Sequence, residues 1–319
     1  MNKRIWANLL HLGTHMWSDR DVTDTLKFDE NLWYDLTERS RVAGINMVVI
    51  DLGEGVVYPS HPELQVKGSW TPGKLAKELK RLREMGIEPI PKINLSACHD
   101  AWLGEYSRML CTPEYYRVVD EIVADVVKLF DHPRFVHIGM DEEVARLQTR
   151  YDYAQSRQGD LWWHDVVYFA RTVEKHGSRA WVWADPAWYF TDYVKRMPKS
   201  VVQSNWFYWK ELPELEQKVD LPPPADEKRP ESPGQNKLVE LRTFLELERA
   251  KYDQIPSATN WDNPEDMYLV TDFCMRRLPP QRLLGFLHET WEFTVRGEKT
   301  ESRHDEYFKL IAPLIKKYG

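Results

Sequence analysis

The sequence predicts an α/β protein built as a single (β/α)8 TIM barrel. Its 319 residues suit one barrel, which typically needs roughly 250 residues plus loop insertions. Short apolar runs alternate with longer amphipathic runs along the chain, and this order is typical of parallel strands joined by helices. An open, doubly wound sheet is the alternative, but no Gly-rich phosphate-binding turn follows the first expected strand.

Eight strands are expected, each short and rich in apolar residues. Glycine stands at three joints where a helical pattern stops and a strand pattern begins, at Gly44, Gly86 and Gly177. Glycine adopts the left-handed conformation at a helix end without steric cost, so these joints predict short helix-to-strand turns. The expected strands cover residues 5–12, 46–52, 88–95, 135–140, 180–184, 201–205, 254–259 and 284–288.

Helix starts carry their own signals. Thr71-Pro72 and Thr112-Pro113 each place a capping hydroxyl before a proline at the first helical position. After each of them, apolar residues recur at helical spacing. The expected helices cover residues 30–43, 72–85, 113–130, 161–176, 191–197, 236–252, 264–278 and 304–318.

A long, Pro-rich and charged connection, residues 212–235, follows the sixth expected strand. Loops of this length are usually functional or disordered, and we expect a lid or a partner contact rather than plain disorder. No second domain is indicated, so residues 1–319 are interpreted as one catalytic barrel domain.

Composition excludes several classes of function. The formal charge is −7 and no basic block occurs, which argues against a nucleic-acid partner. No apolar run approaches the ~20 residues that span a bilayer, so no membrane contact is expected. The three cysteines, Cys98, Cys111 and Cys274, form neither a disulfide framework nor a zinc motif. We expect a cytoplasmic protein without a cofactor, and a homodimer is compatible with the sequence.

The positions just after the expected strands are unusually polar and aromatic. In a barrel these positions surround the active site. Some of the 14 tryptophans can simply fill the core, but an indole face also stacks on a pyranose ring. The strand-end residues are His11, His15, Trp17, Asp51, Glu54, Asn94, His99, Asp100, Asp141, Glu142, Glu143, Trp183, Asp185, Trp188, Asn205, Trp206, Tyr208, Trp209, Asn260, Trp261, Asp262, His288, Glu289, Trp291 and Glu292.

Carboxylates that face a ring of tryptophans favour the cleavage of a glycosidic bond. One carboxyl group must protonate the leaving oxygen, and a negative charge or a nucleophile must stabilise the oxocarbenium-like centre. Aromatic walls would hold the sugar and keep the acid partly desolvated, which raises its pKa. Asp141 and Glu142 are the candidate catalytic pair. Other tryptophans are expected only to pack, among them Trp181, which should face the helices.

Several polar residues have simpler interpretations. His11 and His15 with Asp51 raise the alternative of a metal-dependent barrel, but their spacing is not His-x-His and no metal site is predicted. Asp51 and Glu54 are expected either to bind sugar hydroxyls or to form ion pairs with neighbouring loops. Glu143 is interpreted as a first-turn acid, stabilised by the dipole of the following helix.

One segment carries a family resemblance. Residues 135–142, Phe-Val-His-Ile-Gly-Met-Asp-Glu, resemble the His-x-Gly-Gly-Asp-Glu signature of family 20 glycoside hydrolases, the β-N-acetylhexosaminidases. Met140 stands in place of the second glycine. Further segments are similar, in the same order, to that family's third, sixth and eighth strands, so the resemblance spans most of the barrel. These segments are 86–95 followed by His99, 201–203 leading to Trp206, and 285–291 followed by Glu292.

The resemblance implies substrate-assisted retaining hydrolysis, which releases a terminal β-linked N-acetylhexosamine from a small oligosaccharide or glycoconjugate. Carried over to this chain, Asp141 orients the substrate's acetamido group, and Glu142 is the general acid and then the base. Adjacent residues of a straight strand face opposite sides, so the backbone must turn at the end of the fourth strand. The implied substrate-binding residues are Trp183, Trp206 and Trp291 around the sugar, His99 beside the pair, and Glu292 at the sugar hydroxyls.

Two departures from the family bear on specificity. The family's arginine after the first strand is replaced by Leu-Gly-Thr-His at residues 12–15. The family's tyrosine on the seventh strand, which bonds to the acetamido oxygen, is replaced around Asn260, Trp261 and Asp262. Asn260 or Tyr208 is the expected substitute, and all four are counted among the candidate substrate-binding residues.

Two other functions stay open at this point. A retaining glycosidase of another specificity could use a direct carboxylate nucleophile, such as Glu289 or Glu292. A carbohydrate-binding barrel without turnover would be marked by the loss of one carboxylate of the pair, and both carboxylates are present.

Overall fold

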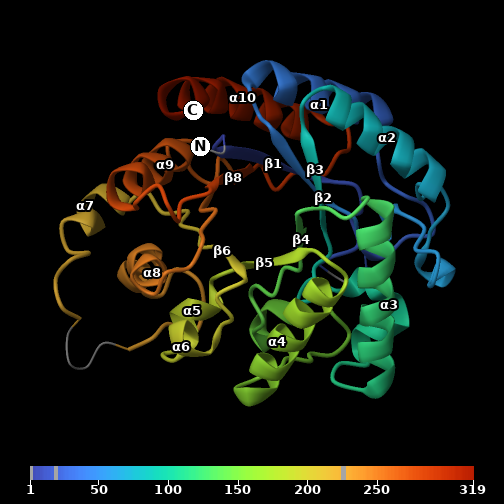
Figure 1. Cartoon of the computed structure of the whole chain (residues 1–319), viewed down its shortest axis with the longest axis horizontal. Coiled ribbons are helices and arrows are strands. Elements are labelled where there is room, and N and C mark those ends of the chain that lie inside the picture. The colour runs from blue at the N-terminus through green and yellow to red at the C-terminus, as the bar shows by residue number, and fades with distance from the viewer. Residues whose placement is uncertain (1–2, 18–20, 224–227) are drawn as a thin grey trace.

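The computed structural model describes residues 3–17, 21–223 and 228–319, and their strands form a parallel barrel (Figure 1). The strands of that part of the chain are β1 (Ile5–His11), β2 (Met47–Asp51), β3 (Glu88–Lys92), β4 (Phe135–His137), β5 (Arg179–Trp183), β6 (Val202–Ser204), β7 (Ser257–Thr259) and β8 (Gly285–Glu289). They pair in the order β6-β5-β4-β3-β2-β1-β8-β7. Between β6 and β7 the ring closes where Ile255 N–H donates to Gln203 O at 3.0 Å. The predicted fold is confirmed.

Helices surround the strands (Figure 1). In the described ranges they are α1 (Glu30–Ala43), α2 (Pro72–Glu84), α3 (Pro113–Leu129), α4 (Asp160–Lys175), α5 (Pro186–Tyr189), α6 (Tyr193–Arg196), α7 (Leu212–Glu216), α8 (Lys237–Arg249), α9 (Asp266–Arg277) and α10 (Glu298–Tyr318). Every expected helix is present in its expected place. The short helices α5 and α7 were not anticipated, and α10 begins earlier than expected.

The predicted helix ends are confirmed. Thr71 Oγ1 accepts from Lys74 N–H at 3.2 Å, and Thr112 Oγ1 accepts from Tyr115 N–H at 3.2 Å. After α1, Gly44 takes a φ of 89° and its N–H donates to Arg41 O at 3.1 Å. Capping of this kind satisfies backbone groups that the helix itself leaves unpaired, so local chemistry determines where each helix begins or ends.

Side chains of the strands pack into two apolar layers, one inside the barrel and one against the helices. Val49 belongs to the inner layer and its neighbour Val48 to the outer one, as the two-residue period of a strand requires. Trp181 lies in the inner layer together with Trp183, and its indole N–H donates to Ser204 Oγ at 2.7 Å. The expectation that Trp181 faces the helices is therefore wrong, because residues two apart on a strand share a face.

The connection 212–235 packs beside α8 over the part that is described. Its helix α7 contacts α8 and α9, and Val219 is buried. The guanidinium of Arg242 on α8 donates to Leu221 O at 3.0 Å. Residues 224–227 of this connection lie outside the described residues, and a lid or partner role for it stays a prediction.

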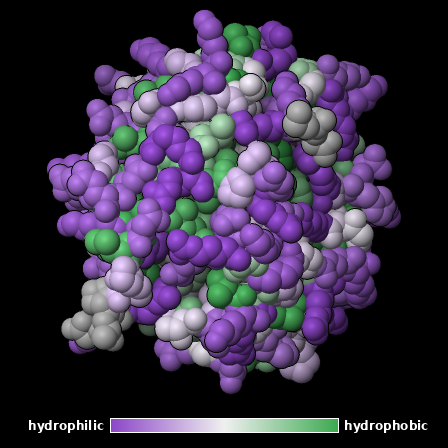
Figure 2. Space-filling model, turned by 60° about the vertical axis from the view of Figure 1, so that its left-hand side comes forward, coloured by the Kyte–Doolittle hydropathy of each residue, from purple (hydrophilic) through white to green (hydrophobic). Residues whose placement is uncertain are grey.

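The exterior is mostly polar. On the face in Figure 2, hydrophilic side chains dominate and the apolar ones form small, separate patches. Among the described residues, no helix combines the length and the apolar character needed to cross a membrane. The first strand and the last helix meet, since the Arg4 side chain donates to the backbone oxygen of Tyr318 (Figure 1).

We predict that Gly285→Ala destabilises the barrel at the β1–β8 pairing. A Cβ at Gly285 would lie 2.1 Å from the backbone oxygen of Ile5, which cannot move without disturbing β1. Such overpacking should lower the free energy of unfolding by about 1–3 kcal/mol, measured by urea titration. Gly73→Ala is the matched control, because no atom lies within 4 Å of its added Cβ. An unchanged urea midpoint for Gly285→Ala would contradict the prediction.

Candidate active site

The chain turns sharply as it leaves β4. Gly139, Met140 and Glu142 have φ angles of 69°, 73° and 52°. A Cβ at Gly139 would lie 2.0 Å from Asn94 Oδ1, so only glycine fits there. Met140 and Glu142 adopt a left-handed backbone that costs a non-glycine residue about 1–2 kcal/mol. This turn lets Asp141 and Glu142, adjacent in sequence, point to the same partner.

That partner is His99, from the loop after β3. Its Nε2 lies 3.3 Å from Asp141 Oδ2 and 3.3 Å from Glu142 Oε2. The Asn94 side chain donates to the other Asp141 oxygen at 2.8 Å. The Glu142 side chain is 30% exposed, against 13% for Asp141 and 8% for His99. Of the three, Glu142 is therefore the most accessible to a ligand that arrives from solvent.

Two further contacts hold the turn. Ser96 Oγ donates to the backbone oxygen of Asp141 at 2.5 Å, and Glu142 N–H donates to Asp185 Oδ2 at 2.9 Å. Burial and the nearby charge of Asp141 raise the pKa of Asp185 far above its usual range. The raised pKa favours the protonated form of Asp185, which would support the turn while limiting the negative charge beside Asp141.

His99 and Asp141 form an ionic pair. Burial alone would lower the pKa of His99, but the charges and hydrogen bonds of Asp141 and Glu142 raise it to about 10. Burial alone would raise the pKa of Asp141, but His99, Lys92 and Asn94 hold it well below its usual range. At neutral pH the site therefore contains an imidazolium beside a carboxylate.

The same three residues could surround a metal ion, since their ligating atoms lie within 4.8 Å of one another. Asp141 and Glu142 raise the pKa of His99, so a metal ion would have to displace the proton that they stabilise on its ring. We assign no metal to this site.

Aromatic side chains from β5, β6 and β8 are gathered at the same end of the barrel. Trp183 N–H donates to Gly139 O at 3.0 Å, which joins the end of β5 to the turn after β4. The rings of Trp183 and Trp291 are 5.8 Å apart, and Trp206 stacks on Tyr208 at 4.7 Å. The indole nitrogen of Trp183 is buried and has no hydrogen-bond partner within the described ranges. The Trp183 side chain is only 1% exposed, so this nitrogen has no open path to a ligand in the structure.

Glu289, at the end of β8, is enclosed. Its Oε1 accepts from Tyr208 Oη at 2.7 Å and from Ser257 Oγ at 2.6 Å. Burial raises the pKa of Glu289 to about 8. This carboxyl group therefore keeps its proton at neutral pH. The hydroxyl proton of Tyr208 is engaged in its hydrogen bond to Glu289.

The candidates after β7 and β8 have other partners. The Asn260 amide donates to the backbone oxygen of Arg303 on α10 at 3.1 Å, so it turns away from the catalytic pair. Trp261 is 47% exposed, and Asp262 is exposed as well. Glu292 Oε1 lies 4.0 Å from Arg303 Nε. No contact joins these residues to Asp141 or Glu142 in the described structure.

Of the two roles expected for Asp51 and Glu54, sugar binding or ion pairing, the structure favours contacts with neighbouring residues of the protein. Asp51 contacts Lys92 and lies 3.4 Å from His11 Nδ1, and all three side chains are at most 2% exposed. Burial alone would raise the pKa of Asp51, but Lys92 and His11 lower it to about 2. Glu54 accepts from His15 N–H at 3.0 Å. These residues stabilise the loops and have little surface to offer a sugar.

The residues that hold the pair in place were only partly anticipated. Asn94 and Asp185 were expected at the strand ends around the site, but nothing in the sequence assigned them a role there. Glu143 was interpreted as a first-turn acid, which is wrong because α4 begins only at Asp160. Instead, Glu143 accepts from Arg157 Nε at 2.6 Å. No local pattern marks Arg157, because its partner lies in a different part of an irregular loop.

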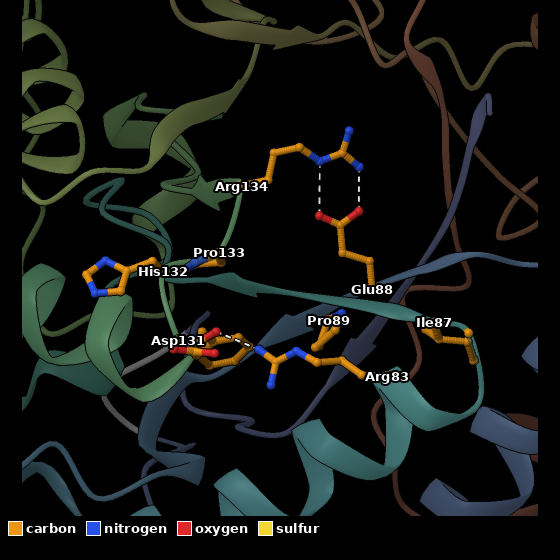
Figure 3. Close-up of a pocket in the computed structure, with 10 residues that line it drawn as sticks. Arg83, Ile87, Glu88, Pro89, Asp131, His132, Pro133 and Arg134 are labelled. Carbon is orange, nitrogen blue, oxygen red and sulfur yellow. Dashed lines mark hydrogen bonds and ion pairs between the residues drawn. The ribbon is translucent and has the colours of Figure 1, made fainter. Parts of the chain in front are cut away.

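A pocket of about 510 Å³ lies at the opposite end of the barrel (Figure 3). It is lined by residues at the beginning of β3 and before β4, including Glu88 and Arg134, which form an ion pair. Arg83 donates to the backbone oxygen of Phe130 at 2.6 Å. It lies at the stability face of the barrel, so we assign it no catalytic role.

Solved structures match this fold, although no protein-family model and no curated protein sequence matches the chain. A β-N-acetylhexosaminidase from Bacteroides fragilis NCTC 9343 superposes with a TM-score of 0.64 at 14% identity, covering 97% of this chain and 65% of that one. The GH20 exo-β-N-acetylglucosaminidase from Vibrio harveyi, in complex with N-acetylglucosamine, gives 0.63 at 13%, covering 98% and 54%. Dispersin B gives 0.60 at 13%, covering 99% of both chains.

The chain thus spans 54% to 65% of the first two matched structures and nearly all of the third. At such low identity the likeness shows a shared fold. The resemblance noted in the segment 135–142 is confirmed at that level: this chain has a (β/α)8 barrel like that of the β-N-acetylhexosaminidases.

We predict that the stabilising effect of His99 depends on pH. The folded-state pKa of about 10 lies above the unfolded value of about 6.5. The contribution of His99 should therefore be complete below pH 6.5 and should be lost as the pH rises toward 10. In urea titrations, the gap in unfolding free energy between wild type and His99→Gln should be largest near pH 6 and should narrow by pH 10. A gap that stays constant or widens would contradict the ionic pairing of His99.

Proposed function

We propose that this chain is a glycoside hydrolase that releases terminal β-linked N-acetylhexosamine from a small oligosaccharide or glycoconjugate, by substrate-assisted retaining catalysis. The observation that carries the proposal is the meeting of Asp141 and Glu142 at one imidazolium, 3.3 Å from each, where the chain leaves β4. The barrel's likeness to β-N-acetylhexosaminidases, one of them bound to N-acetylglucosamine, supports it.

Asp141 is suited to the orienting role. Its carboxylate stays ionised because His99 and Asn94 stabilise the negative charge. An anionic oxygen can accept the acetamido N–H of the substrate, which turns the acetamido oxygen toward the anomeric carbon. The negative charge also stabilises the positive charge that develops on the acetamido group as its oxygen attacks.

Glu142 is suited to the proton transfers. It donates its proton to the glycosidic oxygen while the acetamido oxygen forms a bond to the anomeric carbon and the bond to the leaving group breaks. A water molecule then attacks the anomeric carbon from the side that the leaving group vacated, and the bond between that carbon and the acetamido oxygen breaks. Glu142 takes the proton of that water, which regenerates the acid and gives a retained configuration. Its larger exposure fits contact with an incoming sugar and with water.

Aromatic surfaces supply the sugar-binding wall in this proposal. Trp183 is buried next to the turn that carries the pair, and its ring contacts the partly exposed ring of Trp291. Pyranose C–H groups can stack on the exposed part of Trp291. Tyr208 extends the wall through its contact with Trp206.

A direct carboxylate nucleophile is less well supported. Glu289 is fully buried, holds two hydrogen bonds and has a pKa near 8, so it is mostly protonated and a poor nucleophile at neutral pH. Glu292 adjoins the cations of α10. A binding barrel without turnover is also disfavoured, because both carboxyl groups of the pair are present and adjoin an imidazolium.

We predict that Glu142→Gln loses at least about two orders of magnitude in kcat on aryl N-acetyl-β-hexosaminides, in line with the loss of a general acid. Gln keeps the shape of the side chain but has no proton of suitable acidity to donate. Release of the chromogenic aglycone measures the rate. Glu105→Gln, at an exposed position of the loop after β3, is the control and should keep wild-type kcat. Wild-type turnover by Glu142→Gln would exclude the assigned acid.

We predict that Asp141→Asn loses activity mainly on acetamido sugars, because only they use an oriented acetamido group. A panel of aryl glycosides, with and without the 2-acetamido group, measures this selectivity. A thiazoline-type inhibitor should bind wild type tightly and Asp141→Asn at least about tenfold more weakly, since the variant lacks the anionic partner. Equal losses on plain glucosides and acetamido sugars would contradict the orienting role of Asp141.

A further inference from the structure

The residue after the catalytic pair, Glu143, is saturated with hydrogen bonds. Its Oε1 accepts from the backbone N–H of Arg157 at 2.9 Å and from Arg157 Nε at 2.6 Å. Its Oε2 accepts from Arg157 Nη2 at 2.9 Å and from Ala97 N–H at 3.1 Å. The side chains of Glu143 and Arg157 are 4% and 1% exposed. Neither is available to a substrate, so any effect on catalysis must act through neighbouring residues.

Arg157 also binds two other parts of the barrel. Its Nη2 donates to Leu95 O at 2.5 Å, just beyond β3. Its Nη1 donates to Asp165 Oδ2 at 3.1 Å, within α4. Asp165 in turn accepts from Tyr116 Oη of α3 at 2.6 Å. The guanidinium thus anchors the irregular loop after β4 to the surrounding helical shell.

The contacts of this pair lie on both loops that form the catalytic cluster. Leu95 and Ala97 belong to the segment that leads to His99, and Glu143 is bonded directly to Glu142. A planar guanidinium with a bidentate carboxylate has a fixed geometry, which a flexible ammonium or a single hydrogen bond lacks. Relative movement of the two loops would have to break two of these bonds, from Ala97 N–H to Glu143 and from Arg157 Nη2 to Leu95 O.

We propose that Glu143 and Arg157 form a positioning pair that holds the loop of His99 against the loop of Asp141 and Glu142, and so keeps the acid/base cluster in its reactive geometry. The inference rests on the proposed function and adds two residues to it. Neither residue touches the substrate, and both act through the backbone segments that they join.

The aromatic wall comes from β5, β6 and β8, which the Glu143–Arg157 pair does not hold. Weakening this pair should therefore slow the chemical step more than it weakens substrate binding. In Glu143→Gln, we expect kcat to fall by about 10- to 100-fold, as for small misplacements of catalytic groups. KM should stay within about twofold of wild type, which marks the loss of an interaction needed in the transition state. Unchanged kcat, or a rise in KM alone, would overturn the proposal.

A matched control separates positioning from general stability. Glu78 on α2 is also nearly buried, pairs with the partly exposed Arg81, and accepts from Trp33 Nε1 at 2.7 Å. Glu78→Gln should lower the thermal midpoint as Glu143→Gln does, yet keep wild-type kcat. If both variants lose kcat in proportion to their thermal midpoints, the effect is one of stability and the proposal fails.

Two more variants keep the test decisive if Glu143→Gln folds poorly. Arg157→Lys keeps the charge but loses the planar fork, so kcat should fall by less than in Glu143→Gln. The double variant Glu143→Met with Arg157→Met removes both charges, which often restores stability that a single change has lost. We expect its thermal midpoint to recover while kcat stays low. Recovery of both would show that the pair only stabilises the fold.

Hydrogen exchange tests the pair without any substrate. The amide of Ala97 and the amides of residues 142–145 should exchange at least about tenfold faster in Glu143→Gln than in wild type, but not in Glu78→Gln. Unchanged exchange would overturn the proposal even if the enzyme is active. Faster exchange in a protein that cleaves no acetamido sugar would instead refute the proposed function and leave the link between the loops intact.

Discussion

The turn that follows β4 is the constraint on which the catalytic cluster depends. Two successive side chains of an extended strand point to opposite faces, and only a reversal of the backbone lets both reach one imidazole. Left-handed conformations at Gly139, Met140 and Glu142 provide that reversal. They cost free energy locally, and contacts from the neighbouring loops hold them in place. Asn94 contributes twice, because it fills the space beside Gly139 and donates to Asp141.

Around this turn, similar carboxyl groups acquire different pKa values from their surroundings. The charge of His99 holds the pKa of Asp141 well below its usual range, whereas burial raises the pKa values of Asp185 and Glu289. These opposite shifts reduce the repulsion between acids that share one barrel mouth. Under the proposed function, they separate a group that orients the substrate from the more exposed Glu142, which transfers protons.

The residues after β7 do not lie where we expected substrate-binding residues. The residues after β7 turn toward α10 or to solvent, so the substitute for the missing tyrosine is not found at Asn260. Tyr208 is bound to Glu289 and supports the aromatic wall through Trp206. The cluster of His99, Asp141 and Glu142 is thus built from residues after β3 and β4 with support from Asp185 after β5, and the aromatic cluster comes from β5, β6 and β8.

Local signals in the sequence were enough to predict the barrel, its order of strands and helices and the capped helix starts, and to single out Asp141 and Glu142 as candidates, because periodicity, capping and a strand-end motif involve only neighbouring residues. The packing of distant loops brings His99 to both acids, raises the pKa of Asp185, and pairs Glu143 with Arg157 instead of placing it at a helix start. Such contacts join loops that are distant in the chain. Their charges depend on burial, which no local pattern of residues encodes.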